Sequence, residues 1–291
     1  MVFKIIKRVI NKIFYMFLHK SYNKNLMPFL RYKDSITASW YLSDIYEKSL
    51  NNCIDLFVKD EYNDFFIDIG ANIGLTTIQN YQKFDKTFCF EPNEIVFNIL
   101  KTNVKISCSE IDKISLFNVG LGLKRGQFNL FIPRNNFGGA FVKENNSYNL
   151  KTLSKKDGLK SFDEKNYFNE KVTIEDQIFL EKKVYSHLAK NMKGIIKIDV
   201  EGYEFQIIEL LMGSFPCEKF IIIFENWKDL QIENLRKALD TKKSLKYQIF
   251  SINKPKFFKK KLSEILPSKL TKIDNKDELI PGGNDIVISF F

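Results

Sequence analysis

Short apolar runs and amphipathic stretches alternate along most of this chain. The apolar runs are rich in Ile and Phe, as buried strands are, and lie at 65–69, 86–91, 113–119, 194–200, 219–224, 247–252 and 285–290. Stretches between several of them carry apolar residues at helical spacing, as at 75–83, 93–104 and 229–242. This alternation predicts an α/β fold with a doubly wound, mostly parallel sheet.

Residues 1–20 have a different pattern, in which Lys and Arg recur at near-helical spacing among Ile and Phe. It predicts a basic amphipathic helix, which either makes a peripheral membrane contact or packs on the domain. Its longest apolar run, 13–18, is too short to cross a bilayer, which needs about 20 residues. Residues 21–63 predict a helical lead-in, so we expect an N-terminal helical extension over 1–60 and a catalytic domain over 61–291.

Two further segments carry few signals of regular structure. In a compact domain, a long irregular segment such as 135–171 is usually functional or disordered, so we expect a substrate loop with a disordered middle. The basic run 254–262 contains Phe257 and Phe258. It is either a solvated loop or a surface for phosphates and bases.

Composition narrows the function only a little. The formal net charge is +10, which is typical of nucleic-acid, membrane or anionic-substrate partners but also follows from a Lys-rich, AT-rich coding bias. The four cysteines form no C-x-x-C pair, so neither a zinc site nor a disulfide framework is indicated. Two histidines exclude a histidine-rich metal site. We therefore expect a cytoplasmic protein, with residues 1–20 as a candidate contact to the inner membrane surface.

The strand at 65–69 leads into a glycine turn that is suited to a cofactor. Gly70 and Gly74 let a ligand approach the backbone closely, and the helix after them offers unpaired N–H groups. Glu91, at the end of the next strand, can accept both hydroxyl groups of a ribose. A dinucleotide fingerprint would require glycine at Asn72, which weakens the hypothesis of an NAD-dependent oxidoreductase.

Polar side chains gather at the predicted carboxyl ends of the strands, where open α/β sheets bind ligands. They are Asp68, Glu91, Asn118, Asp199, Glu225 and Asn226. Asp199 follows an apolar run in a strand that should be central, and a carboxylate there is costly unless it is paired or bound. The alternative is that Asp199 caps the helix after the turn at Gly202.

Four motifs in this order resemble the FkbM family of S-adenosylmethionine (SAM) dependent methyltransferases. They are Asp68-Ile-Gly-Ala-Asn-Ile-Gly74, Phe90-Glu-Pro92, Lys197-Ile-Asp-Val-Glu-Gly-Tyr-Glu204 and Phe224-Glu225. The segment Val172–Asp176 is also similar, so the resemblance covers about residues 60–230 and the closing strand. It implies a Rossmann-like class I methyltransferase fold with a seven-stranded sheet whose last strand is antiparallel. It also implies O-methylation, commonly of a sugar or polyketide hydroxyl.

The resemblance also implies roles for individual residues. The methionine part of SAM should contact the glycine turn at Gly70, Ala71, Asn72 and Gly74. Asp68 should orient that turn, and Glu91 should bind the ribose hydroxyls. The adenine edge should lie near Asn118 to Gly120.

Methylation of a sugar hydroxyl requires a general base or a metal ion, because the hydroxyl is a poor nucleophile. Asp199 or Glu204 can act as the base without a metal. Alternatively, Asp199, Glu225 and Asn226 can supply oxygen ligands to Mg²⁺ or another divalent cation.

The expected acceptor is a small molecule or a sugar of a surface glycan, for example as a nucleotide-linked or lipid-linked precursor in polysaccharide biosynthesis. A nucleic-acid methyltransferase is disfavoured, because enzymes that methylate exocyclic amines typically carry Asn/Asp-Pro-Pro-aromatic where this chain has Asp199-Val-Glu-Gly202. A non-catalytic, membrane-associated protein that retains the fold is the other alternative.

Overall fold

The computed structural model describes residues 45–134, 136–144, 149–156, 158–226, 232–241, 245–252, 270–274 and 285–291. The predicted amphipathic helix at 1–20 and the basic run at 254–262 lie outside these ranges. Within them, no helix is both long enough and apolar enough to cross a membrane.

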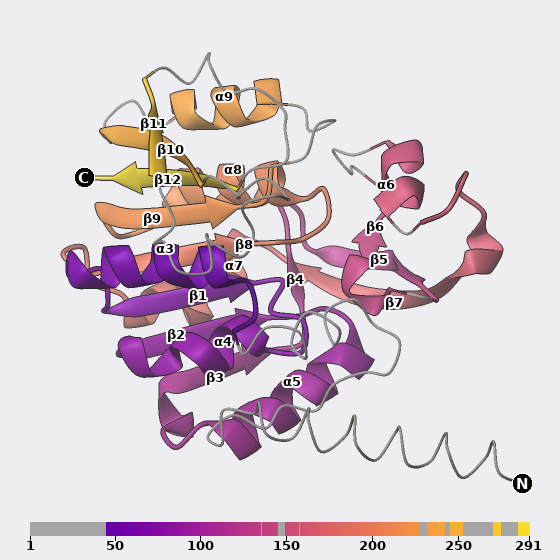
Figure 1. Cartoon of the computed structure of the whole chain (residues 1–291), viewed down its shortest axis with the longest axis horizontal. Coiled ribbons are helices and arrows are strands. Elements are labelled where there is room, and N and C mark those ends of the chain that lie inside the picture. Colours follow the sequence, from indigo (N-terminus) through magenta and orange to yellow (C-terminus); the bar gives the residue numbers. More distant parts are fainter. Residues whose placement is uncertain are drawn as a thin grey trace, which may run out of the picture.

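The described strands form a large sheet in the order β11-β10-β12-β9-β8-β1-β2-β3 (Figure 1). Their bounds are β1 (Phe65–Ile69), β2 (Lys86–Phe90), β3 (Ile114–Phe117), β8 (Lys193–Ile198), β9 (Lys219–Phe224), β10 (Tyr247–Ile252), β11 (Leu270–Ile273) and β12 (Ile286–Phe290). The strands from β9 to β3 in this order are parallel, whereas β12 runs antiparallel to both β9 and β10. The predicted class I methyltransferase fold with an antiparallel last strand is confirmed.

The predicted number of strands is one too low for this sheet. The additional strand, β11, pairs antiparallel with β10 at the edge of the described sheet. Its two central residues, Thr271 and Lys272, are exposed, so the segment lacks the apolar run that marks a buried strand.

Helices cover both faces of the large sheet. They are α3 (Lys48–Lys59), α4 (Leu75–Asn80), α5 (Glu94–Ser107), α7 (Gln177–Lys183), α8 (Glu204–Ser214) and α9 (Ile232–Thr241), with 3-10 turns η1 (Tyr81–Lys83), η2 (Ile111–Lys113) and η5 (Tyr185–His187). Ile54 and Phe57 of α3 belong to the same buried cluster as Phe66 and Ile195, while α8 packs on the opposite face with Ile196. Alternate residues of β1 and β8 thus serve the two faces.

A second, smaller sheet lies beside the carboxyl ends of the parallel strands (Figure 1). Its order is β4-β7-β5-β6 among the described residues, and its elements are β4 (Gly120–Leu121), β5 (Gly126–Pro133), β6 (Phe141–Val142) and β7 (Tyr167–Glu175). The segment between β5 and β7 also contains η3 (Phe137–Gly139), α6 (Leu150–Lys156) and η4 (Glu164–Asn166).

The prediction that 135–171 is irregular is therefore wrong for the described residues, whereas its role as a substrate loop stays a prediction. Phe131, Phe141, Phe162 and Tyr167 form a cluster in which the ring centroids of Phe131 and Phe141 are 5.7 Å apart and those of Phe162 and Tyr167 are 5.1 Å apart. These contacts join residues far apart in sequence, so no local pattern reveals them.

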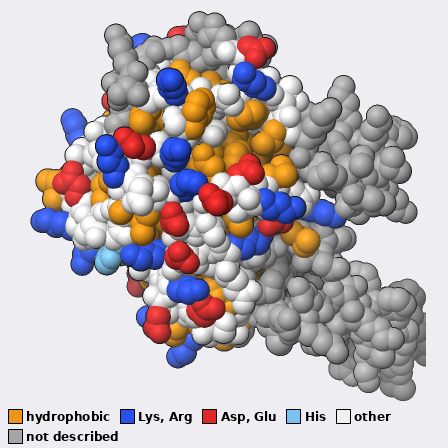
Figure 2. Space-filling model, turned by 90° about the vertical axis from the view of Figure 1, so that its left-hand side faces the viewer, with side chains coloured by type: hydrophobic (Ala, Val, Ile, Leu, Met, Phe, Trp, Pro, Cys, Tyr) orange, Lys and Arg blue, Asp and Glu red, His pale blue; other side chains and the backbone are white. Residues whose placement is uncertain are grey.

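Figure 2 shows the face of the molecule opposite this second sheet. Lys and Arg side chains are mixed there with Asp and Glu. The net positive charge of the chain is therefore not gathered into one basic patch on this face.

Candidate active site

The chain passes from β1 into α4 through a turn that requires glycine. Gly70, Asn72 and Gly74 all have left-handed backbone conformations, with φ of 78°, 52° and 86°. A Cβ atom at Gly70 would lie 1.9 Å from the backbone oxygen of Asp199, so no larger residue fits without displacement of β8. The Gly70 and Ala71 N–H groups donate to the Phe90 carbonyl at 3.0 and 2.9 Å. The turn is thus packed between the ends of β2 and β8.

Gly74 has a structural environment different from that of Gly70. It caps α4, and a Cβ atom there would lie 2.5 Å from Cδ1 of Leu100 in α5. The close approach of the two helices therefore depends on the absence of a side chain at Gly74.

Glu91 follows β2 and holds the other side of the turn. Its Oε2 accepts from the Asn72 N–H at 3.0 Å and its Oε1 from the Asn93 N–H at 2.8 Å. Burial raises the pKa of Glu91 to about 7, although both N–H donors favour the charged form. Each carboxylate oxygen retains a lone pair, so Glu91 can accept further hydrogen bonds from ligand hydroxyls.

The segment after β3 supports Glu91 from behind. The Asn118 side chain is exposed and donates to the carbonyls of Glu91 and Pro92 at 2.9 and 3.2 Å. Gly120 follows in β4, where a Cβ atom would lie 2.5 Å from Cδ1 of Ile174. Asn118 therefore stabilises the turn after β2, and Gly120 brings the second sheet close to it.

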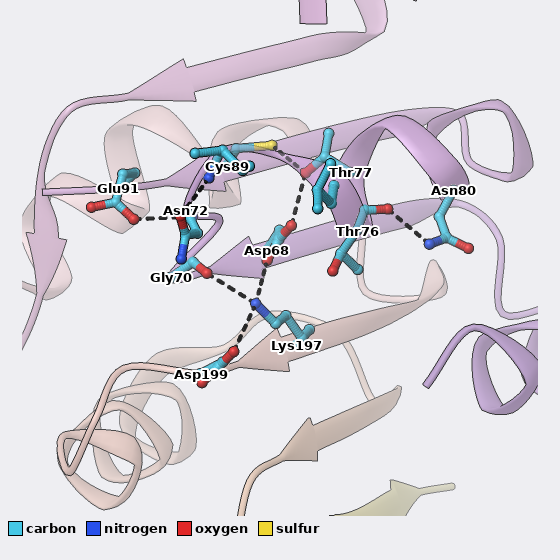
Figure 3. A network of polar contacts seen from close by, with 12 residues as sticks. Asp68, Gly70, Asn72, Thr76, Thr77, Asn80, Cys89, Glu91, Lys197 and Asp199 are labelled. Atoms are coloured by element: carbon cyan, nitrogen blue, oxygen red, sulfur yellow. Dashed lines mark hydrogen bonds and ion pairs between the residues drawn. The ribbon is translucent and has the colours of Figure 1, made fainter. Parts of the chain in front are cut away.

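A buried cluster of charges joins β1, β8 and the glycine turn (Figure 3). Lys197 Nζ lies 3.2 Å from Asp68 Oδ1 and 3.5 Å from Asp199 Oδ2, and it donates to the Gly70 carbonyl at 2.9 Å. Asp68 is completely buried and also accepts from Thr77 Oγ1 at 2.8 Å. Asp68 is thus linked to both ends of the turn. It pairs with Lys197, which binds the Gly70 carbonyl, and it accepts a hydrogen bond from Thr77 in α4.

Lys197 is cationic in this environment. Burial alone would lower its pKa, but Asp68, Asp199 and Glu47 outweigh burial and raise the pKa above its usual range. Lys197 is absent from the site residues predicted from the sequence. The sequence nevertheless marks Lys197 as unusual. A lysine inside the apolar run 195–198 of a central strand is costly unless carboxylates pair with it.

The acids at the ends of β8 and β9 differ in their surroundings. The Asp199 side chain is 34% exposed, whereas Glu204 is buried and its Oε1 accepts from the Gly202 N–H at 3.2 Å. Glu225 is half-buried and Asn226 is buried. In the described part of the chain, no three His, Cys, Asp or Glu side chains are grouped so as to hold a metal ion. The divalent cation stays a prediction.

The start of α3 also belongs to this neighbourhood, although no chemistry was predicted for it from the sequence. Glu47 has a left-handed backbone, with φ of 47°, and the Asn51 side chain donates to its carbonyl at 3.2 Å. The Tyr46 N–H donates to Gln79 Oε1 in α4 at 2.9 Å. Glu47 is exposed, and its carboxylate lies close enough to Asp199 and Lys197 for both charges to act on it in opposite directions.

These elements line a cavity that is open to solvent, and its empty space, with the solvent at its mouth included, is about 730 Å³. Its walls are Ile69, Gly70, Asn72, Phe90, Glu91, Pro92, Val96, Gly120, Leu121, Leu130, Phe137, Gly138, Ala140, Val142, Ile174, Asp199, Val200, Glu201, Tyr203 and Ile207. Five predicted site residues line it, namely Gly70, Asn72, Glu91, Gly120 and Asp199. The other predicted residues lie outside its lining, namely Asp68, Ala71, Gly74, Asn118, Glu204, Glu225 and Asn226. Sequence reasoning missed Tyr203. It expected a substrate loop over 135–171, which contributes Phe137, Gly138, Ala140 and Val142, but it singled out no residue of that segment as a site residue.

Comparisons with known proteins give a family match and a set of remote structural likenesses. The model of the methyltransferase FkbM domain matches residues 68–248. A methyltransferase FkbM structure from Methylobacillus flagellatus KT is 11% identical, with a TM-score of 0.38 over 79% of this chain and 44% of that chain. This chain thus spans less than half of that protein. A search of curated proteins found no match.

Two further solved structures show the breadth of these likenesses. An O-methyltransferase from Bacillus cereus in complex with SAH is 10% identical, with a TM-score of 0.43 over 83% of this chain and 80% of that chain. A putative rRNA methylase from Clostridium thermocellum is 10% identical, with a TM-score of 0.41 over 84% of this chain and 98% of that chain.

Proposed function

The chain belongs to the FkbM methyltransferase family, and we propose that it transfers the methyl group of SAM to a hydroxyl group of a sugar. Membership in the family supports SAM-dependent methyl transfer as the class of reaction. One observation carries the proposal: the glycine turn and Glu91 line the same cavity as Asp199. A cofactor site and a candidate base therefore face one space.

The residues at this cavity fit SAM. The turn at Gly70 presents backbone without a side chain, and Glu91 retains acceptor positions for two ribose hydroxyls. Phe90, Pro92 and Leu121 provide apolar surface for a flat base. When bound, SAM supplies an electrophilic methyl group.

Asp199 is the candidate general base for the acceptor hydroxyl. It lines the cavity and is partly exposed, so an acceptor can reach it. Lys197 Nζ lies 3.5 Å from Asp199 Oδ2, and this ion pair orients the carboxylate. Glu204, the other candidate, accepts from the Gly202 N–H and does not line the cavity. A positioned base typically contributes about 10²–10⁴ in rate.

We place the reaction in the cytoplasm and connect it with polysaccharide biosynthesis. All four cysteines are free and buried in the described part of the chain, which fits a reducing compartment. The sugar acceptor rests on the habit of the family.

The test is calorimetric titration with S-adenosylhomocysteine, followed by methyl transfer from labelled SAM to a panel of sugars. Wild type and Asp199→Asn should bind S-adenosylhomocysteine, and neither should bind NADH. Gly70→Val should lose binding, because its side chain collides with β8. Gly213→Val is the matched control, because a Cβ atom there would meet Gln177 Oε1 only at 4.0 Å and no closer atom outside its own helix backbone.

Turnover separates the cofactor site from the base. Asp199→Asn should lower kcat by about 10²-fold or more with the cofactor affinity retained. Absence of S-adenosylhomocysteine binding, or full turnover by Asp199→Asn, would contradict the proposed site. Binding without methylation of any sugar would reject the sugar acceptor.

A further inference from the structure

The segment from β5 through η3 to β6 provides a wall of the cavity to which no part of the cofactor was assigned above. Leu130, Phe137, Ala140 and Val142 of this wall are apolar, and Ile207 of α8 continues the apolar surface. Leu130 and Val142 are otherwise buried, so their exposed surface is directed to the cavity rather than to bulk solvent.

This wall is anchored on both sides. Tyr203, at the start of α8, donates its hydroxyl hydrogen to the backbone carbonyl of Glu144, next to β6. Behind the wall, Phe141 packs edge-on against Tyr167 of β7, with ring centroids 5.6 Å apart. The apolar surface is therefore preformed, and a ligand need not order it on binding.

The charges at the cavity are opposite to those of the whole chain. Its described lining contains Glu91, Asp199 and Glu201 but no lysine or arginine, although the chain carries a formal net charge of +10. Lys197 is near, but it is engaged with Asp68, Asp199 and the Gly70 carbonyl. Recognition of phosphate groups normally uses charge-assisted donors such as Arg and Lys. The described lining has none to offer.

We propose that the acceptor is an uncharged glycoside whose apolar aglycone packs against the wall formed by Leu130, Phe137, Ala140 and Val142, and that nucleotide-linked sugars are rejected. This inference rests on the proposed methylation of a sugar hydroxyl and narrows it to one class of carrier. Carboxylates repel a pyrophosphate, whereas each buried methylene group of an aglycone should raise the affinity about fourfold.

The test is calorimetric titration of the full chain saturated with S-adenosylhomocysteine. The ligands are methyl, butyl, hexyl and octyl glycosides of several hexoses, below their micelle concentrations, and the UDP and GDP derivatives of the same hexoses. We expect the affinity to rise with alkyl length and the octyl glycoside to bind at least about tenfold more tightly than the nucleotide sugar.

Variants of the wall test the location of the aglycone. Phe137→Ala should lower the affinity for the octyl glycoside about tenfold and leave that for the methyl glycoside within about twofold. Val142→Ala should act in the same direction with a smaller effect, and it serves as the second variant if Phe137→Ala folds poorly. Ile178→Ala is the control, because Ile178 is 58% exposed on α7 and should leave both affinities unchanged.

The outcomes distinguish this inference from the proposed function. A nucleotide sugar that binds as tightly as the octyl glycoside overturns the inference, and so does binding of neither ligand. With labelled SAM in place of S-adenosylhomocysteine, methylation of the nucleotide sugar would then still support sugar O-methylation. An octyl glycoside that binds through Phe137 without being methylated supports the ligand class and rejects the proposed reaction.

Discussion

Replacement of Lys197 by methionine should strongly destabilise the fold. The substitution conserves length and removes the cation that lies 3.2 Å from the completely buried Asp68. Removal of one partner from a buried ion pair typically costs about 3–5 kcal/mol, because the other charge remains desolvated. The Gly70 carbonyl also loses its donor at 2.9 Å. We expect a loss of about 4 kcal/mol, a large part of the about 5–15 kcal/mol that stabilises a typical domain.

Urea unfolding followed by far-UV circular dichroism measures the loss in free energy of unfolding. In thermal unfolding, Tm should fall by about 10 °C. Lys193→Met is the matched control, because Lys193 lies in the same strand and pairs with an exposed acid, Glu61, at 2.9 Å. Its effect should lie within the error of the measurement, as for most surface ion pairs. The effect of Lys197→Met should not change near neutral pH. The raised pKa of Lys197 keeps its contribution fully present below the ordinary lysine pKa, and the contribution is lost only at higher pH.

A second substitution identifies the cause of the loss. In Asp68→Asn/Lys197→Met the buried charge is absent, and the amide oxygen introduced at position 68 can still accept from Thr77. The double variant should recover about 2 kcal/mol or more relative to Lys197→Met alone. This account of the buried pair is refuted if Lys197→Met is no more destabilising than Lys193→Met, or if the two substitutions at the buried pair are additive.

Three further measurements test the site itself. The affinity for S-adenosylhomocysteine should rise with pH and level off above about 7, because the charged Glu91 carboxylate is the better acceptor. Glu91→Gln should weaken binding and remove this pH dependence, which calorimetry across pH 6–8 can check. Asn118→Ala should weaken cofactor binding by up to about tenfold, since it removes two hydrogen bonds to the turn after β2, and an unchanged Kd would contradict that role. If Asp199 acts without a metal ion, EDTA should leave kcat unchanged, whereas loss of turnover that Mg²⁺ restores would favour the predicted cation site.

Much of the cofactor side was predictable because its signals are local. Gly70 and Glu91 each follow an apolar strand directly, and parallel strands bring their carboxyl ends to one edge. Asp199 reaches the same edge because β8 is the other neighbour of β1. Strand periodicity and sheet topology therefore suffice to bring these three residues together.

The cavity wall from β5, η3 and β6 was not predictable in this way, although the sequence indicated 135–171 as a substrate loop. β5 and β7 pair Phe131 with Asn169 and Leu130 with Glu170, across a segment with little apolar periodicity of its own. Lys197 was visible as an anomaly, but its three partners come from β1, the glycine turn and the end of β8. The position of Glu47 depends on hydrogen bonds that join its own segment to Asn51 in α3 and Gln79 in α4. Long-range contacts decide each of these features.

The charges at the cavity bear on which residues should contribute to cofactor binding and which to the rate of methyl transfer. SAM carries a positive sulfonium, so a lining with Glu91, Asp199 and Glu201 should favour it over the product, which has lost that charge. The same carboxylates stabilise the charged ground state, so they do not by themselves lower the barrier. We therefore expect the rate to come from alignment by the rigid glycine turn and from proton removal by Asp199. Lys197 should support both, because it contacts the Gly70 carbonyl and Asp199 at once.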